Sequence, residues 1–174
     1  LEKLEYRGYD SAGIAVIDSD NKKLVCHKSE GKLKNLKQKL DKKIISGSLG
    51  IGHTRWATHG KPVLRNAHPH CDWTKQVAVV QNGIIENYFE LKTKLESEGI
   101  VFTSETDTEV IPHLIQKELN NLSNLNLENS GSTLLIAVRN VISDLEGAYA
   151  LAVIWSGSPD SLVVARKQAP LIIG

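Results

Sequence analysis

Residues 50–60 read Gly50-Ile51-Gly52-His53-Thr54-Arg55-Trp56-Ala57-Thr58-His59-Gly60. The stretch begins with the small and β-branched residues of a strand, and it then places arginine, tryptophan and histidine between glycines. The donors of these three side chains need partners if they are buried, so this is poor core material. We interpret the stretch as a strand that leads into a rigid loop forming the wall of a polar pocket.

Two later stretches also place polar residues at the ends of apolar runs. They are Gln81-Asn82-Gly83 and Ser104-Glu105-Thr106-Asp107. We expect these two stretches and residues 50–60 to meet around one small zwitterionic substrate.

Arg55 and Asp107 carry the charges that such a substrate requires. Arginine grips a carboxylate with two hydrogen bonds, and an aspartate is a natural partner for an ammonium group. The alternative is that the two residues are unrelated and that Asp107 serves the start of a helix beside Thr106. Spacing in the sequence leaves both interpretations open.

Asn82-Gly83 also has two interpretations. A side-chain amide beside a backbone N–H of flexible conformation can direct two donors at one developing negative oxygen, as in an oxyanion hole. Asn-Gly is equally the strongest short signal for a type I′ hairpin turn. On sequence alone the turn is favoured.

Histidines and cysteines suggest other chemistries that the spacing does not support. The histidines between residues 53 and 70 invite a zinc interpretation, but no acidic residue or second ligand pair lies at zinc-like spacing. We therefore expect no metal and no other cofactor. Cys26 alternates with apolar neighbours as a core residue does, and Cys71 follows a His-Pro-His segment. Neither has an orienting base beside it, so neither is expected to be a nucleophile.

Composition excludes several broad classes of function. The 174 residues suffice for one domain with a proper core, and the net charge of +1 gives no attraction to nucleic acid or membrane. No apolar run approaches the length of a membrane span, and two cysteines make no disulfide framework. We therefore expect a cytoplasmic protein. The chain has no methionine, opens at Leu1 inside a helix-like pattern and stops in an apolar run, so we expect it to be truncated at both ends.

Apolar periodicity predicts an α+β fold with layered sheets. The expected helices cover residues 1–6, 31–43, 87–98, 106–119 and 133–145, with a loop over 120–132. The expected strands cover residues 11–18, 23–27, 48–53, 76–81, 100–103, 147–155 and 161–166. Asn87 is predicted to cap one helix, and Thr106 with Glu109 has the pattern of a capping box for the next.

Five motifs together resemble the glutaminase domain of the glutamine–fructose-6-phosphate aminotransferase family, which are class II, N-terminal-nucleophile amidotransferases. The motifs follow the family's order along most of the chain and are Leu4–Gly13, His53–Gly60, Asn66–His70, Asn82–Asn87 and Ser104–Val110. The resemblance implies a four-layer αββα fold with two facing, mainly antiparallel sheets. It also implies one glutaminase domain over residues 1–174.

The resemblance assigns roles to seven residues. It implies that Arg55 holds the glutamine carboxylate, that Asp107 holds the amine, and that Thr58 and His59 line the same loop. Asn82 and the Gly83 N–H would form the oxyanion hole, and Trp56 would gate the exit of ammonia. In the family an N-terminal cysteine attacks the glutamine carboxamide, and ammonia travels to a C-terminal sugar isomerase domain that converts fructose 6-phosphate to glucosamine 6-phosphate.

The chain departs from the family pattern at both ends. The catalytic cysteine is expected upstream of Leu1 and the sugar isomerase domains downstream of Gly174, so residues 1–174 alone should be inactive. The expected partners are L-glutamine, the isomerase domain of the same full-length chain, and further copies of that chain in a homo-oligomer. Two alternatives are the glutaminase domain of another class II enzyme, such as amidophosphoribosyltransferase, and a non-catalytic glutamine-binding module.

Overall fold

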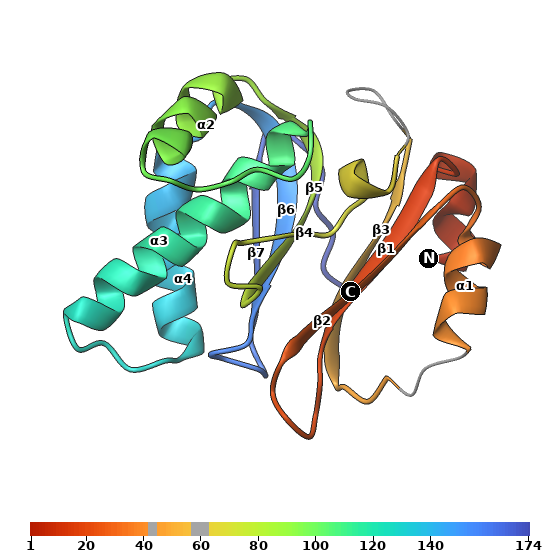
Figure 1. The fold of residues 1–174 in the computed structure, drawn as a ribbon, viewed down its shortest axis with the longest axis horizontal. Helices are drawn as coiled ribbons and strands as arrows, with labels where there is room; N and C mark the ends of the chain where they lie inside the picture. The colour runs from red at the N-terminus through yellow and green to blue at the C-terminus, as the bar shows by residue number, and fades with distance from the viewer. Residues whose placement is uncertain (42–44, 57–62) are drawn as a thin grey trace.

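The computed structural model describes residues 1–41, 45–56 and 63–174. Figure 1 shows four layers: helix α1, a first sheet, a second sheet that faces it, and a layer containing helices α3 and α4. The predicted α+β class and its four-layer αββα arrangement are therefore confirmed.

The first sheet has three strands in the order β2-β1-β3, all antiparallel. Its strands are β1 (Ser11–Ile17), β2 (Leu24–Glu30) and β3 (Leu49–Arg55). Helix α1 (Leu33–Leu40) covers its outer side, where Leu33 and Leu36 are buried against Ala12. The 3-10 helix η1 (Glu2–Arg7) precedes β1.

The second sheet has four strands in the order β4-β5-β6-β7, again antiparallel. These strands are β4 (His70–Cys71), β5 (Val77–Ile85), β6 (Gly147–Trp155) and β7 (Leu162–Lys167). The largest core cluster lies between this sheet and helices α2 (Tyr88–Ser97), α3 (Val110–Asn124) and α4 (Gly131–Ser143). Two short 3-10 helices complete the chain, η2 (Leu64–Asn66) and η3 (Asp107–Glu109).

The two sheets pack against each other through apolar side chains at one end. A small cluster of Ala15, Ile17 and Ile51 from the first sheet and Ala78 and Ile154 from the second closes this end. Because side chains alternate between the faces of a strand, the inner face continues from Ile51 to His53 and Arg55, and from Ala78 to Asn82. These continuations are polar, and they line the other end of the space between the sheets.

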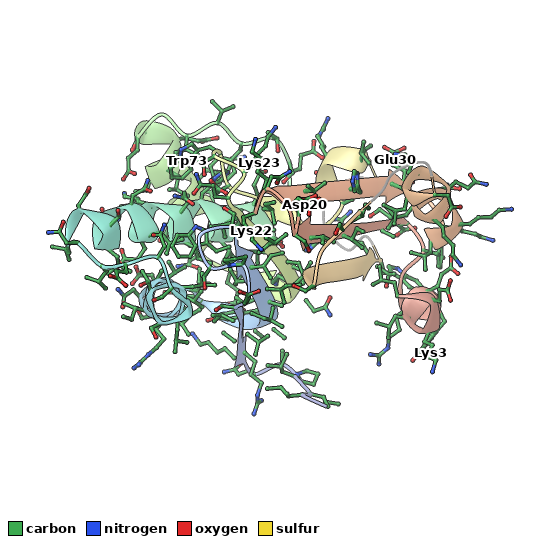
Figure 2. The ribbon with its side chains drawn as sticks, turned by 90° about the horizontal axis from the view of Figure 1, so that it is seen from below. Lys3, Asp20, Lys22, Lys23, Glu30 and Trp73 are labelled. Carbon is green, nitrogen blue, oxygen red and sulfur yellow. The ribbon has the colours of Figure 1, made fainter. Side chains whose placement is uncertain are left out.

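The turn between β1 and β2 is held by the side chain of Asp18. Asp18 Oδ1 accepts hydrogen bonds from the backbone N–H groups of Asp20 and Asn21, both at 3.0 Å. This is the Asx-turn geometry that aspartate favours. Figure 2 shows Asp20, Lys22 and Lys23 together at this hairpin, on the surface.

Most predicted elements are present, and three differences bear on the site. Strand β3 extends to Arg55, so this residue lies on a strand and not in a loop. Strand β5 runs through Asn82-Gly83, which pair with Ala150 and Tyr149 of β6, so the predicted turn is wrong. The predicted strand over residues 100–103 is absent; Ile100 N instead bonds to Leu95 O, and Thr103 N bonds to a Glu109 carboxylate oxygen.

Asn87 and Thr106 occupy the N-cap positions of α2 and η3, as predicted, but neither side chain makes a capping bond, because the polar groups bond to other partners. The Asn87 side chain bonds to Asp144 O and Glu146 N, which join helix α2 to the start of β6. The Glu109 carboxylate accepts from the backbone and hydroxyl of Thr103 and Ser104, and the Thr106 side chain makes no cap bond. Helix α3 also continues to Asn124, five residues beyond its predicted end at Leu119.

Across the residues that the structure describes, the helices are all too short or too polar to span a bilayer.

Candidate active site

A cavity of about 970 Å³ lies at the open end between the two sheets. Its walls come from η1, β3, β5, β6 and η3, and the segment Pro170–Ile172 contributes to its rim. The residues that carry its chemistry are His53, Arg55, Trp56, Asn82, Gly83 and Asp107. The described parts of the three polar stretches therefore meet at one place, as expected.

Arg55 brings a positive charge to this cavity. It ends β3 and is almost completely buried, with 6% of its surface exposed. Burial lowers the pKa of its guanidinium, while the carboxylates of Asp10 and Asp107 raise it. The two acidic neighbours therefore offset part of the cost of burying the cation.

Asp107 lies at the start of η3, whereas Arg55 lies at the end of β3. Its Oδ2 accepts a hydrogen bond of 2.7 Å from the backbone N–H of Ile85 at the end of β5. The next residue, Thr108, donates to Gln81 Oε1 at 2.6 Å. These two bonds fix η3 to β5 and hold the Asp107 carboxylate beside the cavity. The structure thus brings Arg55 and Asp107 to one cavity, so they are not unrelated.

Asn82 and Gly83 lie in the middle of the β5–β6 pairing and are both exposed at the cavity. Gly83 has a φ of +119°, and a Cβ there would lie 2.0 Å from the carbonyl oxygen of Ala148. Only glycine fits this conformation and this approach. The Asn-Gly pair therefore marks a strand that passes unusually close to its neighbour.

Trp56 directly follows β3 and is 55% exposed at the cavity. Its ring packs at a tilt of 58° on Tyr9, with 5.3 Å between the ring centroids. Thr58 and His59, the two other candidate site residues of the predicted loop, lie outside the described residues.

Three histidines form a compact group at the cavity, in which His68 and His70 are buried and His53 is half-buried. The rings of His53 and His68 stack with centroids 4.4 Å apart, and His70 meets His68 edge-on at 4.8 Å. Burial lowers the pKa of His70 to about 3, with the Lys28 charge acting in the same direction. Within residues 1–41, 45–56 and 63–174, no group of three His, Cys, Asp or Glu side chains could hold a metal ion.

The two cysteines lie elsewhere. Cys26 and Cys71 are free thiols that pack against the apolar cluster at the closed end of the sheet interface. Contact with Cys26, together with burial, raises the pKa of the Cys71 thiol well above its ordinary value. Neither residue is among those that line the cavity.

Sequence reasoning missed one polar partner of the site, the bond between His53 Nε2 and Asn82 Oδ1 at 2.7 Å. The two residues are separated by 29 positions and belong to different sheets. Strand periodicity would have placed His53 on the same face as Arg55, had the strand been extended to Arg55. No signal in the sequence pairs it with Asn82.

Comparison with known proteins identifies the family. Residues 53–173 match the model of a family described as "Glutamine amidotransferase domain". The chain belongs to the glutamine amidotransferase family. A relative from Thermosynechococcus vestitus, named glutamine–fructose-6-phosphate aminotransferase (isomerizing), is 56% identical over all 174 residues. A relative of the same name from Methanothermobacter thermautotrophicus is 48% identical over the same length. The resemblance seen in the sequence is confirmed.

Solved structures of amidotransferases have the same fold as this chain. It superposes with a TM-score of 0.72 on the glutamine phosphoribosylpyrophosphate amidotransferase of B. subtilis, at 30% identity over 95% of this chain and 32% of that one. A structure described as the allosteric regulatory enzyme of purine biosynthesis gives the same TM-score at 31% identity, covering 94% of this chain and 32% of that one. The chain spans about a quarter of the curated relatives, 26% of the Thermosynechococcus protein and 28% of the Methanothermobacter protein.

Proposed function

We propose that residues 1–174 form one glutaminase domain that binds L-glutamine between the two sheets and releases ammonia from it. The observation that carries the proposal is the presence of Arg55 and Asp107 in one cavity with Asn82 and Gly83. Arg55 binds the α-carboxylate of glutamine and Asp107 binds its α-ammonium group. The side-chain carboxamide then reaches toward Asn82 and Gly83.

The chemistry assigned to this cavity is acyl transfer. A cysteine thiol attacks the carboxamide carbon, and the negative oxygen that develops accepts hydrogen bonds from Asn82 Nδ2 and the Gly83 N–H. Ammonia leaves as the γ-glutamyl thioester forms, and water then releases glutamate. Because Cys26 and Cys71 do not line the cavity, we assign the attack to the N-terminal cysteine that the family resemblance implies. Its own α-amino group, with a pKa of about 8, serves as the base.

The ammonia is proposed to serve the synthesis of glucosamine 6-phosphate from fructose 6-phosphate. The relatives that support this are 48–56% identical and share the name glutamine–fructose-6-phosphate aminotransferase. The proposal includes a sugar isomerase domain in the same full-length chain, a homo-oligomeric enzyme, and a role for Trp56 in closing the path of ammonia. Thr58 and His59 are proposed to help bind glutamine. The phosphoribosylpyrophosphate amidotransferase is the second candidate, and its identity of 30% makes it the weaker one.

The test uses the natural full-length protein, with glutamate release measured from glutamine alone, with fructose 6-phosphate, and with phosphoribosyl pyrophosphate. We expect glucosamine 6-phosphate to form only with fructose 6-phosphate. Absence of glutamate release under every condition would contradict the glutaminase assignment. Formation of phosphoribosylamine would instead support the second candidate function, that of a phosphoribosylpyrophosphate amidotransferase.

Arg55→Ala tests the binding role within the same assay. Loss of charge-assisted hydrogen bonds to the carboxylate should raise the KM for glutamine by roughly 10- to 100-fold and change kcat much less. Arg139→Ala, an exposed change on helix α4, is the matched control and should leave both constants unaltered. An unchanged KM in the Arg55 variant would remove this residue from the carboxylate site.

A further inference from the structure

A hydrogen bond between side chains joins the two sheets at the cavity. His53 Nε2 on β3 lies 2.7 Å from Asn82 Oδ1 on β5. Both residues line the cavity, and Asn82 is exposed to it. A bond of this length in the wall of a cavity fixes the orientation of the amide that a ligand meets.

The environment of the imidazole determines which atom is the donor. Burial lowers the pKa of His53, so the ring is neutral near pH 7 and carries one proton. The Nδ1 atom is buried and has no hydrogen-bond partner among the described residues. A proton there would be a buried donor without an acceptor, which proteins avoid more strictly than a buried acceptor without a donor. The proton therefore lies on Nε2, which donates to Asn82.

This donor fixes the polarity of the Asn82 amide. With Oδ1 occupied by His53, the group that the amide can offer to a ligand is the Nδ2 donor. The opposite tautomer would accept from Nδ2 and leave Oδ1 for the ligand. A carbonyl oxygen next to a developing negative oxygen would raise the energy of the transition state and would not lower it.

The imidazole ring of His53 is itself held in place. It stacks on His68 with 4.4 Å between centroids and 21° between planes. His68 Nδ1 accepts a bond of 3.3 Å from the backbone N–H of Gln81, the residue before Asn82. Two successive residues of β5 are thus bonded to two stacked histidines, which leaves the His53 ring little room to turn.

We propose that His53 is a positioning residue for glutamine hydrolysis: its Nε2–H holds the Asn82 amide so that Nδ2 points its hydrogen at the developing oxyanion. The inference rests on the proposed function, because it requires Asn82 to be an oxyanion donor. His53 itself touches neither the thiol nor the carboxamide in this scheme. Its effect passes entirely through Asn82.

Two substitutions in the full-length protein separate the hydrogen bond from simple packing. His53→Leu removes the donor, and we expect kcat for glutamate release to fall roughly 10- to 100-fold, less than the loss for removing an oxyanion donor. The KM for glutamine should change by less than about twofold, since ground-state binding is assigned to Arg55 and Asp107. His53→Gln keeps an N–H at about the position of Nε2 and should restore most of kcat. If His53→Gln does not restore kcat, the inference is overturned.

A double-mutant cycle with Asn82→Ala provides the second measurement. If His53 acts only through Asn82, then His53→Leu costs nothing further once the Asn82 amide is absent. An equal fall in both backgrounds would show a structural role and overturn the inference. If His53→Leu does not accumulate as folded protein, His53→Asn, whose amide is too short to reach Asn82, replaces it in the cycle.

The outcomes distinguish the inference about His53 from the proposed glutaminase function on which it rests. No glutamate release by the wild type would overturn both. A wild-type rate in Asn82→Ala would remove the oxyanion role, and with it the role of His53. A slow Asn82→Ala beside a fast His53→Leu would overturn the inference about His53 alone.

Discussion

The two ends of the space between the sheets are built from the same strands but hold opposite kinds of side chain. At the closed end Ala78 and Ile154 are completely buried, with 0% of their surfaces exposed. Four residues along β5 from Ala78, Asn82 is exposed to the cavity. On β3, Ile51 belongs to the closed end, whereas His53 and Arg55 belong to the open one.

This contrast separates stability from chemistry along each strand. The closed end holds the sheets together by burying apolar surface, worth roughly 25 cal/mol per Å². The open end carries a buried arginine, stacked histidines and an exposed amide, which cost stability unless each has a partner. The polar groups at the open end therefore depend on the apolar closed end, which holds the two sheets at a fixed distance.

Gly83→Ala should have the largest effect, because β5 can approach β6 at the open end only without a side chain. The added Cβ would lie 2.0 Å from Ala148 O, and φ is +119°. Strain and overpacking together should lower the free energy of unfolding by roughly 3–6 kcal/mol, measured by urea denaturation. Gly99→Ala is the control, since φ is +89° there but nothing lies within 4 Å of the new Cβ. It should cost only about 1–2 kcal/mol, and equal losses would show that the approach to β6 is unimportant.

Asn82→Ala should remove chemistry at a small cost in stability. Loss of one oxyanion donor should lower kcat for glutamate release by about 10²- to 10³-fold in the full-length protein. The free energy of unfolding should fall by only about 0.5–1.5 kcal/mol, the usual worth of the lost hydrogen bond with His53. Asn121→Ala on the outer helix α3 is the matched control and should change neither quantity. A variant as fast as the wild type would place the oxyanion donor elsewhere.

Ile154→Ala should do the reverse, lowering stability and sparing the chemistry. Truncating this completely buried side chain should cost about 2–4 kcal/mol, from lost burial and a cavity. Below the melting temperature, kcat should remain near that of the wild type. Ile136→Ala, at a position 38% exposed on α4, should cost much less. A large fall in kcat at constant fold would show that the closed end also controls the geometry of the site.

Glu109→Gln should have the smallest effect and a dependence on pH. Burial alone would raise the pKa of Glu109, but the nearby His113 and hydrogen bonds from Ser104 and Thr103 lower it well below the ordinary value. The ionised carboxylate therefore stabilises the folded state above the unfolded pKa of about 4.3, and this contribution is lost as the pH falls below it. At pH 7 the variant should be less stable by roughly 1–3 kcal/mol, and the difference should narrow below about pH 4.3.

Urea denaturation at several pH values measures this difference. Glu90→Gln, an exposed change on helix α2, is the control and should match the wild type throughout. A gap in stability that is constant between pH 7 and the acid limit would contradict the role assigned to the Glu109 charge.

Prediction from sequence succeeded where a signal is local and failed where the partner is remote. Strands β1 and β6 and helix α4 were predicted correctly because the apolar pattern of each lies within one short segment. The Asn82-Gly83 turn was wrong because the dipeptide signal is the same for a hairpin and for a glycine forced into a strand by a neighbour's backbone. The N-cap positions of Asn87 and Thr106 were predicted correctly, but the capping bonds were not formed. The side chains of Asn87 and Glu109 bond instead to Asp144 and Glu146, and to Thr103 and Ser104.

The sequence by itself determined the fold class, the family and the expectation that three polar stretches surround one ligand. Residue type and spacing suffice for these conclusions, because they depend on which side chains exist and on the period at which they recur. The tertiary structure alone decided which atoms meet: His53 with Asn82, Asp107 with Ile85, and Gly83 with the β6 backbone. Such contacts depend on the distance between two sheets, and no pattern within one strand specifies that distance.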